Sequence, residues 1–162
     1  MPNINTAVEW AIAVARDNRH GYDQAHRNGP DYDCSSLVAT ALKQGGFDVS
    51  EFSWTGNLYI QLMVNGFYPV PINSKRQKGD IFLNEDHHVV MCINESEIVQ
   101  ASINEFGSVI GGQTGDQTGR EIYICPYYDF YAGWDWHLRP PEESYIEEPK
   151  VRELVINFVM GS

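Results

Sequence analysis

The hydrophobic pattern of this 162-residue chain changes once, near Gly66, and this change constrains the fold more than any other feature. Before it, apolar residues recur at helical spacing. The predicted helices cover residues 7–15, 34–43 and 57–65. After it, short runs rich in β-branched residues alternate with turn residues. The predicted strands cover residues 81–83, 87–93, 97–103 and 121–125. Helices followed by a hairpin-rich sheet indicate an α+β domain, with the helices packed on one face of an antiparallel sheet.

Composition excludes several classes of partner and cofactor. The chain carries 22 acidic against 11 basic residues, a formal net charge of -11, whereas nucleic-acid phosphates and anionic lipids require clustered Lys and Arg. Its three cysteines are too few for a disulfide scaffold, and no Cys or His spacing is typical of zinc, so we expect neither a metal nor a cofactor. No apolar run approaches a membrane span, and the N-terminus does not have the form of a secretory signal. We therefore expect synthesis in the cytoplasm without a signal peptide.

Cys34 is the candidate nucleophile because it opens a predicted helix. Asp33 precedes that helix, and Gly45-Gly46 ends it. The start of a helix supplies partial positive charge and free N–H groups, which favour the reactive thiolate and can hold an oxyanion. A cysteine at this place is also typical of a small buried apolar residue. The first helix is expected to be capped by Asn5 or Thr6.

His88 is the candidate base, and Gln100 is the candidate third member of the group. His88 begins the first hairpin strand, and Gln100 follows twelve residues later on the partner strand, roughly across from it. A hairpin packed on the Cys34 helix would bring the imidazole to the thiol, and the Gln100 side chain would fix the imidazole tautomer. Alternation along the strand points His87 to the opposite face. A histidine in a strand can equally be an ordinary hydrogen-bonding partner.

Three stretches together resemble a known family. Residues 21–42, GYDQAHRNGPDYDCSSLVATAL, resemble the active-site helix of NlpC-type peptidoglycan hydrolases, which are papain-like enzymes of the cell wall. More narrowly, they are similar to the phage endolysin branch with its GPxYDCSS signature. Gly79-Asp80 and His88-Val89 match the sheet of that family in order, and residues 114–124 with 133–140 are similar to prophage lysins. The resemblance covers roughly residues 6–140, and it implies an NlpC-type catalytic domain over residues 1–141.

The resemblance also implies roles for single residues. Cys34 matches the nucleophile, and His88 matches the general base that later protonates the leaving amine. Gln100 stands where many members carry a second histidine. This departure weakens the assignment of a Cys34–His88–Gln100 triad and leaves the Cys34–His88 dyad intact. The residues implied to bind or order the substrate are Asp33, Tyr22 and Ser35. For Tyr22 and Ser35, local packing and helix capping are equally good explanations.

The implied activity is hydrolysis of an amide bond in the stem peptide of bacterial peptidoglycan, without a metal. The bond is left open between N-acetylmuramoyl-L-alanine amidase and endopeptidase cleavage. We expect the catalytic domain of a phage or prophage endolysin, released to the cell wall after synthesis, with residues 142–162 forming an acidic linker and the start of a wall-binding module. The alternatives are a papain-like acyltransferase or transglutaminase-type enzyme, and a non-catalytic wall-binding module. The aromatic run 127–136 either walls the substrate groove or closes the core.

Overall fold

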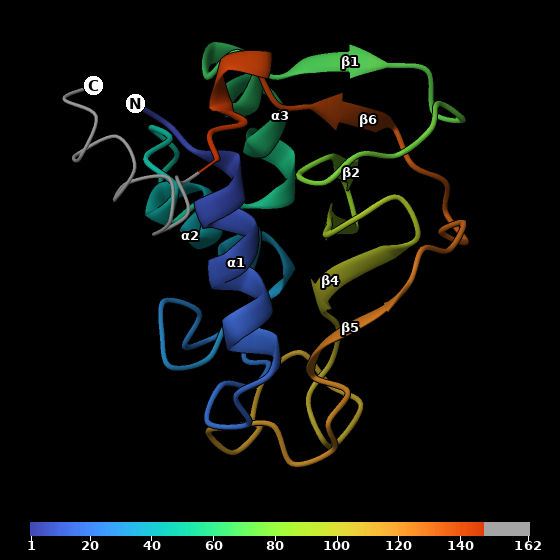
Figure 1. Cartoon of the computed structure of the whole chain (residues 1–162). Helices are drawn as coiled ribbons and strands as arrows, with labels where there is room; N and C mark the ends of the chain where they lie inside the picture. The colour runs from blue at the N-terminus through green and yellow to red at the C-terminus, as the bar shows by residue number, and fades with distance from the viewer. Residues whose placement is uncertain (148–162) are drawn as a thin grey trace, which may run out of the picture.

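The computed structural model describes residues 1–147 and has the predicted α+β architecture, with three helices preceding six strands (Figure 1). The helices are α1 (Ile4–Ala15), α2 (Cys34–Gln44) and α3 (Thr55–Val64). The strands are β1 (Tyr68–Val70), β2 (Ile81–Asn84), β3 (His88–Cys92), β4 (Glu97–Ala101), β5 (Ile122–Pro126) and β6 (Trp136–Arg139), followed by the short 3-10 helix η1 (Glu142–Ser144). None of the helices within these residues combines the length and the apolarity that a membrane crossing needs.

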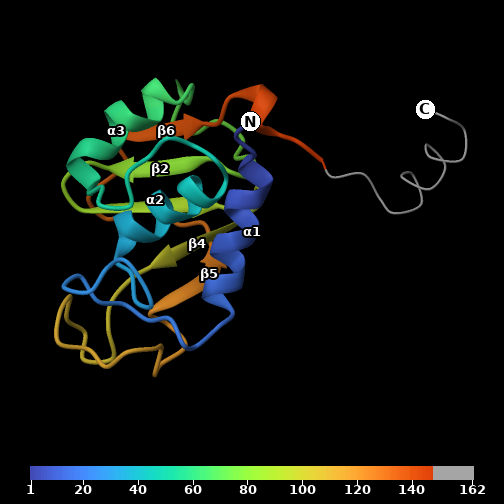
Figure 2. The ribbon, with the colours of Figure 1, turned by 90° about the vertical axis from the view of Figure 1, so that its left-hand side faces the viewer.

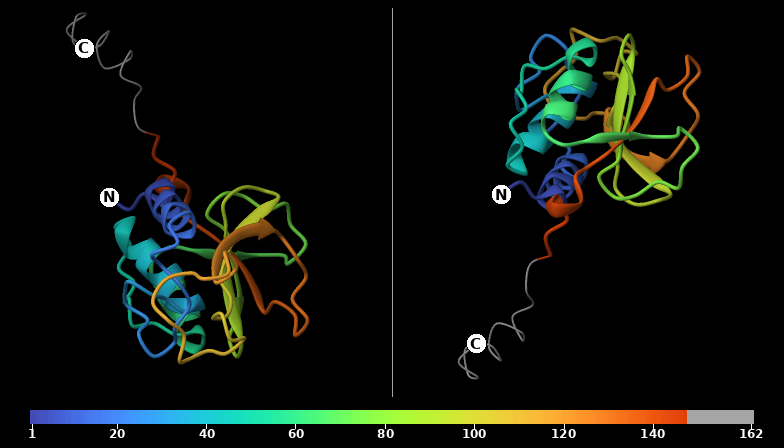
Figure 3. Two further views of the ribbon diagram at one scale, coloured as in Figure 1. Left: turned by 90° about the horizontal axis from the view of Figure 1, so that it is seen from below. Right: turned by 90° about the horizontal axis from the view of Figure 1, so that it is seen from above.

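The strands form one antiparallel sheet in the order β1-β6-β2-β3-β4-β5. The three helices lie on one face of it, as the two views along the vertical axis make plain (Figure 3). The predicted hairpin is confirmed, because β3 pairs with β4 through Met91 opposite Val99. Strands β1 and β6 were not predicted: each is only three or four residues long, and β6 reaches its place between β1 and β2 through pairing with residues far away in the chain.

The sheet buries apolar residues on both faces. The main core lies between helices and sheet, where Ile4, Val8, Leu37, Leu42, Leu58, Ile81, Met91 and Leu138 are fully buried. A smaller cluster of Phe82, Val90, Cys92 and Ile98 lies on the other face and is covered by Tyr127, Tyr128 and Trp134 from the connection between β5 and β6. Part of the aromatic run therefore closes the core.

The helix starts follow the local capping rules, with one correction. Asn3, not Asn5 or Thr6, caps α1: its Oδ1 accepts from the Asn5 N–H at 2.9 Å, and its own N–H donates to Gly45 O at 2.7 Å. Because Ile4 is fully buried, the helix has to begin early enough to include it. Asp33 caps α2 through a reciprocal capping box with Ser36, a role that we had not predicted for it.

A buried ionic cluster joins β6 to the turn before β2. The Asp80 carboxylate lies 2.6 Å from His137 Nε2 and 2.9 Å from Arg139 Nη2, and both Asp80 and His137 are fully buried. Burial alone would raise the pKa of the Asp80 carboxyl, but hydrogen bonds from His137 and Arg139 outweigh it and hold that pKa below its usual value. The hydrogen bond between Asp80 and His137 therefore joins two segments that lie 57 residues apart in sequence.

Replacing Asp80 with Ala is expected to lower the free energy of unfolding by about 3 kcal/mol or more, because the buried His137 and the half-buried Arg139 lose their shared hydrogen-bonding partner. Urea unfolding followed by circular dichroism would measure it. The matched control is Lys75→Ala, which breaks an exposed pair with Glu95 at 3.1 Å and should leave stability nearly unchanged. Equal effects of the two substitutions would show that the buried cluster does not hold β6.

Candidate active site

The N-terminus of α2 places Cys34 against the start of β3. The backbone N–H groups of Val89 and Ser35 lie close enough to the Cys34 sulfur to lower its pKa. Val89 is the residue after His88, so the thiol and the predicted base come from adjoining ends of two packed elements. Cys34 itself is half-buried. In the view turned by 90°, the start of α2, the end of β2 and the end of β4 lie at one end of the molecule (Figure 2).

The thiol of Cys34 is held in its neutral form. Burial raises the pKa of this thiol to about 12, and the negative charge of Asp33 raises it further, while Val89, Ser35 and Arg27 only partly offset these effects. The expectation that the helix start would depress this pKa is therefore wrong for the unliganded protein. Desolvation and the capping carboxylate outweigh the helix-terminus effect.

His88 is paired with Gln100 as the sequence predicted. Its Nε2 lies 2.9 Å from Gln100 Oε1. The hairpin register sets Gln100 opposite Val90, so His88 and Gln100 are diagonal neighbours on one face of the sheet. An amide oxygen only accepts, which puts the proton on Nε2 and leaves Nδ1 with a lone pair. Burial lowers the pKa of His88, and the bond to Gln100 offsets part of this shift. The imidazole is therefore poised as a neutral base.

Two tyrosines that the sequence did not single out fix the Gln100 side chain. The Tyr128 hydroxyl donates to Gln100 Oε1 at 2.6 Å, and Gln100 Nε2 donates to the Tyr123 hydroxyl at 3.1 Å. Gln100 is 3% exposed, and its Nε2 also lies 3.6 Å from Cys125 Sγ, so protein groups surround the whole amide. Tyr123 pairs with Gln100 across β4 and β5, which a known register would have predicted, whereas Tyr128 comes from a loop without any periodic signal.

Aromatic rings wall the imidazole on one side. The His88 ring lies 5.6 Å from the Phe130 ring and 6.1 Å from the Trp134 ring, both nearly parallel to it. The loop that carries them is tied to the end of β2, where Asn84 Nδ2 donates to Gly133 O at 2.7 Å. His87 is exposed and does not share the contact with Gln100. The aromatic run thus walls the site with Phe130 and Trp134, while Tyr127 and Tyr128 help to close the smaller core.

The three residues expected to bind or order the substrate lie around Cys34. Tyr22 is 6% exposed. Burial raises the pKa of its hydroxyl above the usual value, and negative charge at Cys34 and Asp33 raises that pKa further. Asp33 and Ser35 are buried. Asp33 Oδ1 accepts from the Ser36 N–H at 2.9 Å and from Ser35 Oγ at 3.3 Å. These contacts give both residues a role in shaping the first turn of α2.

Arg27 is a site residue that the sequence did not indicate, because it lies in a Gly- and Pro-rich loop. Its guanidinium donates to Asp33 at 3.2 Å, to Ser35 Oγ at 2.8 Å and to the backbone carbonyls of Phe52 and Ser53. One half-buried cation therefore joins the cap of α2 to the segment that precedes α3.

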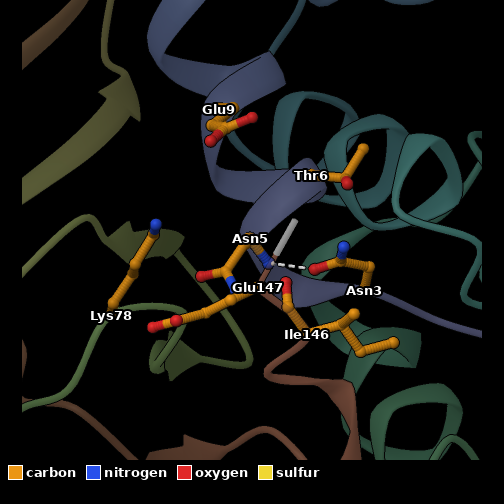
Figure 4. A pocket seen from close by; sticks show the side chains of 7 residues that line it. All are labelled: Asn3, Asn5, Thr6, Glu9, Lys78, Ile146 and Glu147. Carbon is orange, nitrogen blue, oxygen red and sulfur yellow. Dashed lines mark hydrogen bonds between the residues drawn. The ribbon is translucent and has the colours of Figure 1, made fainter. Parts of the chain in front are cut away.

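A separate pocket of about 520 Å³ lies at the other end of the molecule (Figure 4). Its lining residues are Asn3, Asn5, Thr6, Glu9, Lys78, Ile146 and Glu147. Asn3 binds Gly45 at the C-terminus of α2, and that helix has 11 residues, so the pocket is about 15 Å from Cys34. It contains neither Cys nor His. Residues 142–147 of the predicted linker pack here, since Asn5 Nδ2 donates to Ile146 O at 2.9 Å.

The predicted linker and wall-binding module fall mostly outside the described residues, which end at 147. Their boundary at residue 141 stays a prediction. Within the described residues, no group of three or more His, Cys, Asp or Glu side chains is arranged to hold a metal ion.

Comparison with known proteins agrees with the resemblance seen in the motifs. Residues 98–157 match the endolysin-like domain family. The fold is similar to that of the wild-type endolysin LysIME-EF1, with a TM-score of 0.58 and 14% identity over 89% of this chain and 67% of that chain. It is also similar to the peptidoglycan hydrolase RipB of Mycobacterium tuberculosis, with a TM-score of 0.50 and 18% identity over 90% of this chain and 68% of that chain. No curated protein sequence matches the chain.

These findings define the class of protein. The resemblance to phage endolysins and other peptidoglycan hydrolases is confirmed: the C-terminal part of the chain matches an endolysin-like domain, and the whole described chain has a fold found in an endolysin and in a peptidoglycan hydrolase. At these identities, the likeness to the solved structures concerns the fold. The chemistry of the site has to be argued from its own residues.

Proposed function

We propose that this chain hydrolyses an amide bond in the peptide part of bacterial peptidoglycan, with Cys34 as nucleophile, His88 as base and Gln100 as the residue that orients the base. The observation that carries the proposal is the hydrogen bond of 2.9 Å between His88 Nε2 and Gln100 Oε1, next to the Val89 N–H that acts on the Cys34 sulfur. It leaves the second imidazole nitrogen as the acceptor for the thiol proton.

The proposed reaction has two stages. The Cys34 sulfur attacks the amide carbonyl carbon while its proton passes to His88 Nδ1. The tetrahedral intermediate collapses, the C–N bond breaks, and the amine leaves with the proton from His88. Water then attacks the thioester as His88 takes a proton from it, which releases the acid and restores the thiol. Gln100 stabilises the imidazolium that forms in each stage through its side-chain oxygen.

The oxyanion of the intermediate needs donors near the sulfur. At the start of α2, Asp33 Oδ1 already occupies the N–H of Ser36, so we assign the first donor to the backbone N–H of Cys34 itself. The Tyr22 hydroxyl is the second donor, since its pKa responds to charge at Cys34. Asp33 and Ser35 are proposed to order this turn and to bound the stem peptide. The likeness to endolysins supports a phage or prophage enzyme, made in the host cytoplasm and acting on the wall after release. Amidase and endopeptidase cleavage both fit this chemistry.

The proposal is tested on purified Gram-positive cell walls, with mass spectrometry of the released fragments. The native protein should release fragments whose new amino or lactyl ends name the bond. Alkylation by iodoacetamide, mapped to Cys34 by peptide analysis, should abolish that release. Release that persists with Cys34 fully alkylated would overturn the cysteine mechanism. Products in which an added amine replaces water would indicate acyl transfer instead, and no product from any wall or soluble muropeptide would refute hydrolysis.

A further inference from the structure

Trp54 is a large aromatic residue held at the surface. It directly precedes the first turn of α3, and the residue is 58% exposed. Its backbone is fixed from both sides: its N–H donates to Asn57 Oδ1 at 2.9 Å, and its carbonyl accepts from the Asn57 N–H at 3.1 Å. Neither backbone group is free to pair with another chain.

The indole of Trp54 packs against α3 at Gly56, where no side chain is in its way. A Cβ added at Gly56 would lie 2.0 Å from Cζ3 and 2.3 Å from Cη2 of that indole, so the ring lies directly over the glycine. Glycine within a helix is less favourable than alanine. The arrangement covers one face of the indole and leaves the rest open, in an orientation fixed before any ligand arrives.

Trp54 also stands beside the candidate active site. Arg27 Nη2 donates to Ser35 Oγ at 2.8 Å and to the carbonyl of Ser53, the residue before Trp54. The same guanidinium therefore binds the first turn of the nucleophile helix and the segment that carries the indole. Figure 2 agrees: α2 and α3 begin at the same end of the molecule, where β2 also ends.

We propose that Trp54 is a stacking platform for a sugar ring of the glycan strand that is joined to the stem peptide. This inference rests on the proposed function, since the stem peptide of peptidoglycan is attached to a sugar. A pyranose ring presents a face of C–H bonds that packs against the electron-rich face of an indole. An extended peptide would instead need backbone donors and acceptors in a row, and those of Trp54 are occupied by Asn57.

Binding measured on full-length Cys34→Ala protein tests the proposal without turnover. The probes are a disaccharide–peptide and the same peptide without sugars, titrated by calorimetry. Adding Trp54→Ala should raise the Kd for the disaccharide–peptide about threefold to tenfold, the range expected for one aromatic contact. The Kd for the free peptide should not change. The control is Tyr68→Ala, another exposed aromatic residue, on the edge strand β1, which should alter neither value.

Gly56→Ala gives an independent test, because it displaces the indole while favouring the helix. It should weaken disaccharide–peptide binding to a similar extent and leave the protein at least as stable. Equal loss for both probes would make Trp54 a peptide contact and overturn the proposal, and so would unchanged binding in either variant. Failure of the proposed function is seen separately, as an absence of hydrolysis by the native protein toward any muropeptide.

Discussion

Cys34→Ala is expected to lower kcat for wall hydrolysis by about 10⁴-fold or more, the scale seen when the nucleophile of a catalytic group is removed. Of the other described cysteines, Cys92 is buried on the far face of the sheet, and Cys125 contacts Gln100 from strand β5, away from any helix start, so neither should replace the lost nucleophile. Cys34 is half-buried at the edge of the main core, and its replacement by Ala removes a single sulfur atom, so the variant should fold. Mass spectrometry of fragments released from purified walls measures the rate, and circular dichroism checks the fold.

The matched control for this loss is Cys92→Ala. Cys92 is fully buried on the other face of the sheet, within the cluster around Phe82. Its replacement removes a sulfur from the core and should lower stability while leaving kcat within about threefold of the native value, because no interaction made in the transition state is lost. A Cys92→Ala protein as inactive as Cys34→Ala, or a Cys34→Ala protein that still clears walls, would contradict the assignment of the nucleophile.

The core of the site could be predicted because it depends on local rules. The apolar helical pattern that follows Cys34 defines a helix with the cysteine in its first turn, and the structure has it. A strand period of two and a short turn place His88 and Gln100 on one face, and their side chains meet at 2.9 Å. The same alternation set His87 apart, and it is exposed.

The missed elements depend on contacts between distant residues. Strand β6 is defined by its pairing with β1 and β2. It has four residues, of which only the two central ones are buried, so its sequence shows no alternation of apolar and polar residues. Arg27 and Tyr128 lie in loops, where the chain path decides what a side chain reaches. Only the fold brings Arg27 to Ser35 and Tyr128 to Gln100.

The pKa of Cys34 shows how a local rule fails once the chain is packed. A helix start stabilises a thiolate by a modest amount that falls off with distance. Packing against β3 removes water from the sulfur, and the capping carboxylate of Asp33 adds a negative charge beside it. Both effects involve residues that the sequence analysis had named. Their net effect on the thiol pKa depends on how deeply the sulfur is buried, and the sequence pattern of residues 34–43 does not predict that burial.

His88→Ala is expected to lower kcat/KM at pH 7 by about 10³-fold, within the range for loss of a general base. The pH dependence should change as well. In the native protein, burial lowers the pKa of His88. The imidazole therefore keeps its neutral form to a lower pH than an ordinary histidine, and the acid limb of kcat/KM should lie below the usual histidine pKa of about 6.5. No alkaline limb from the thiol is expected near neutral pH, since its pKa is about 12.

The variant has no base to take the thiol proton, so it depends on thiolate formed in solution. Its rate should rise about tenfold for each pH unit above neutrality, because the thiolate fraction does so at any pH well below the pKa. His87→Ala is the matched control: it removes the neighbouring histidine, which is exposed and makes no contact with Gln100, and it should leave the profile unchanged. An acid limb centred above pH 6.5 in the native protein, or a flat alkaline profile for His88→Ala, would show that the proton leaves Cys34 by another route.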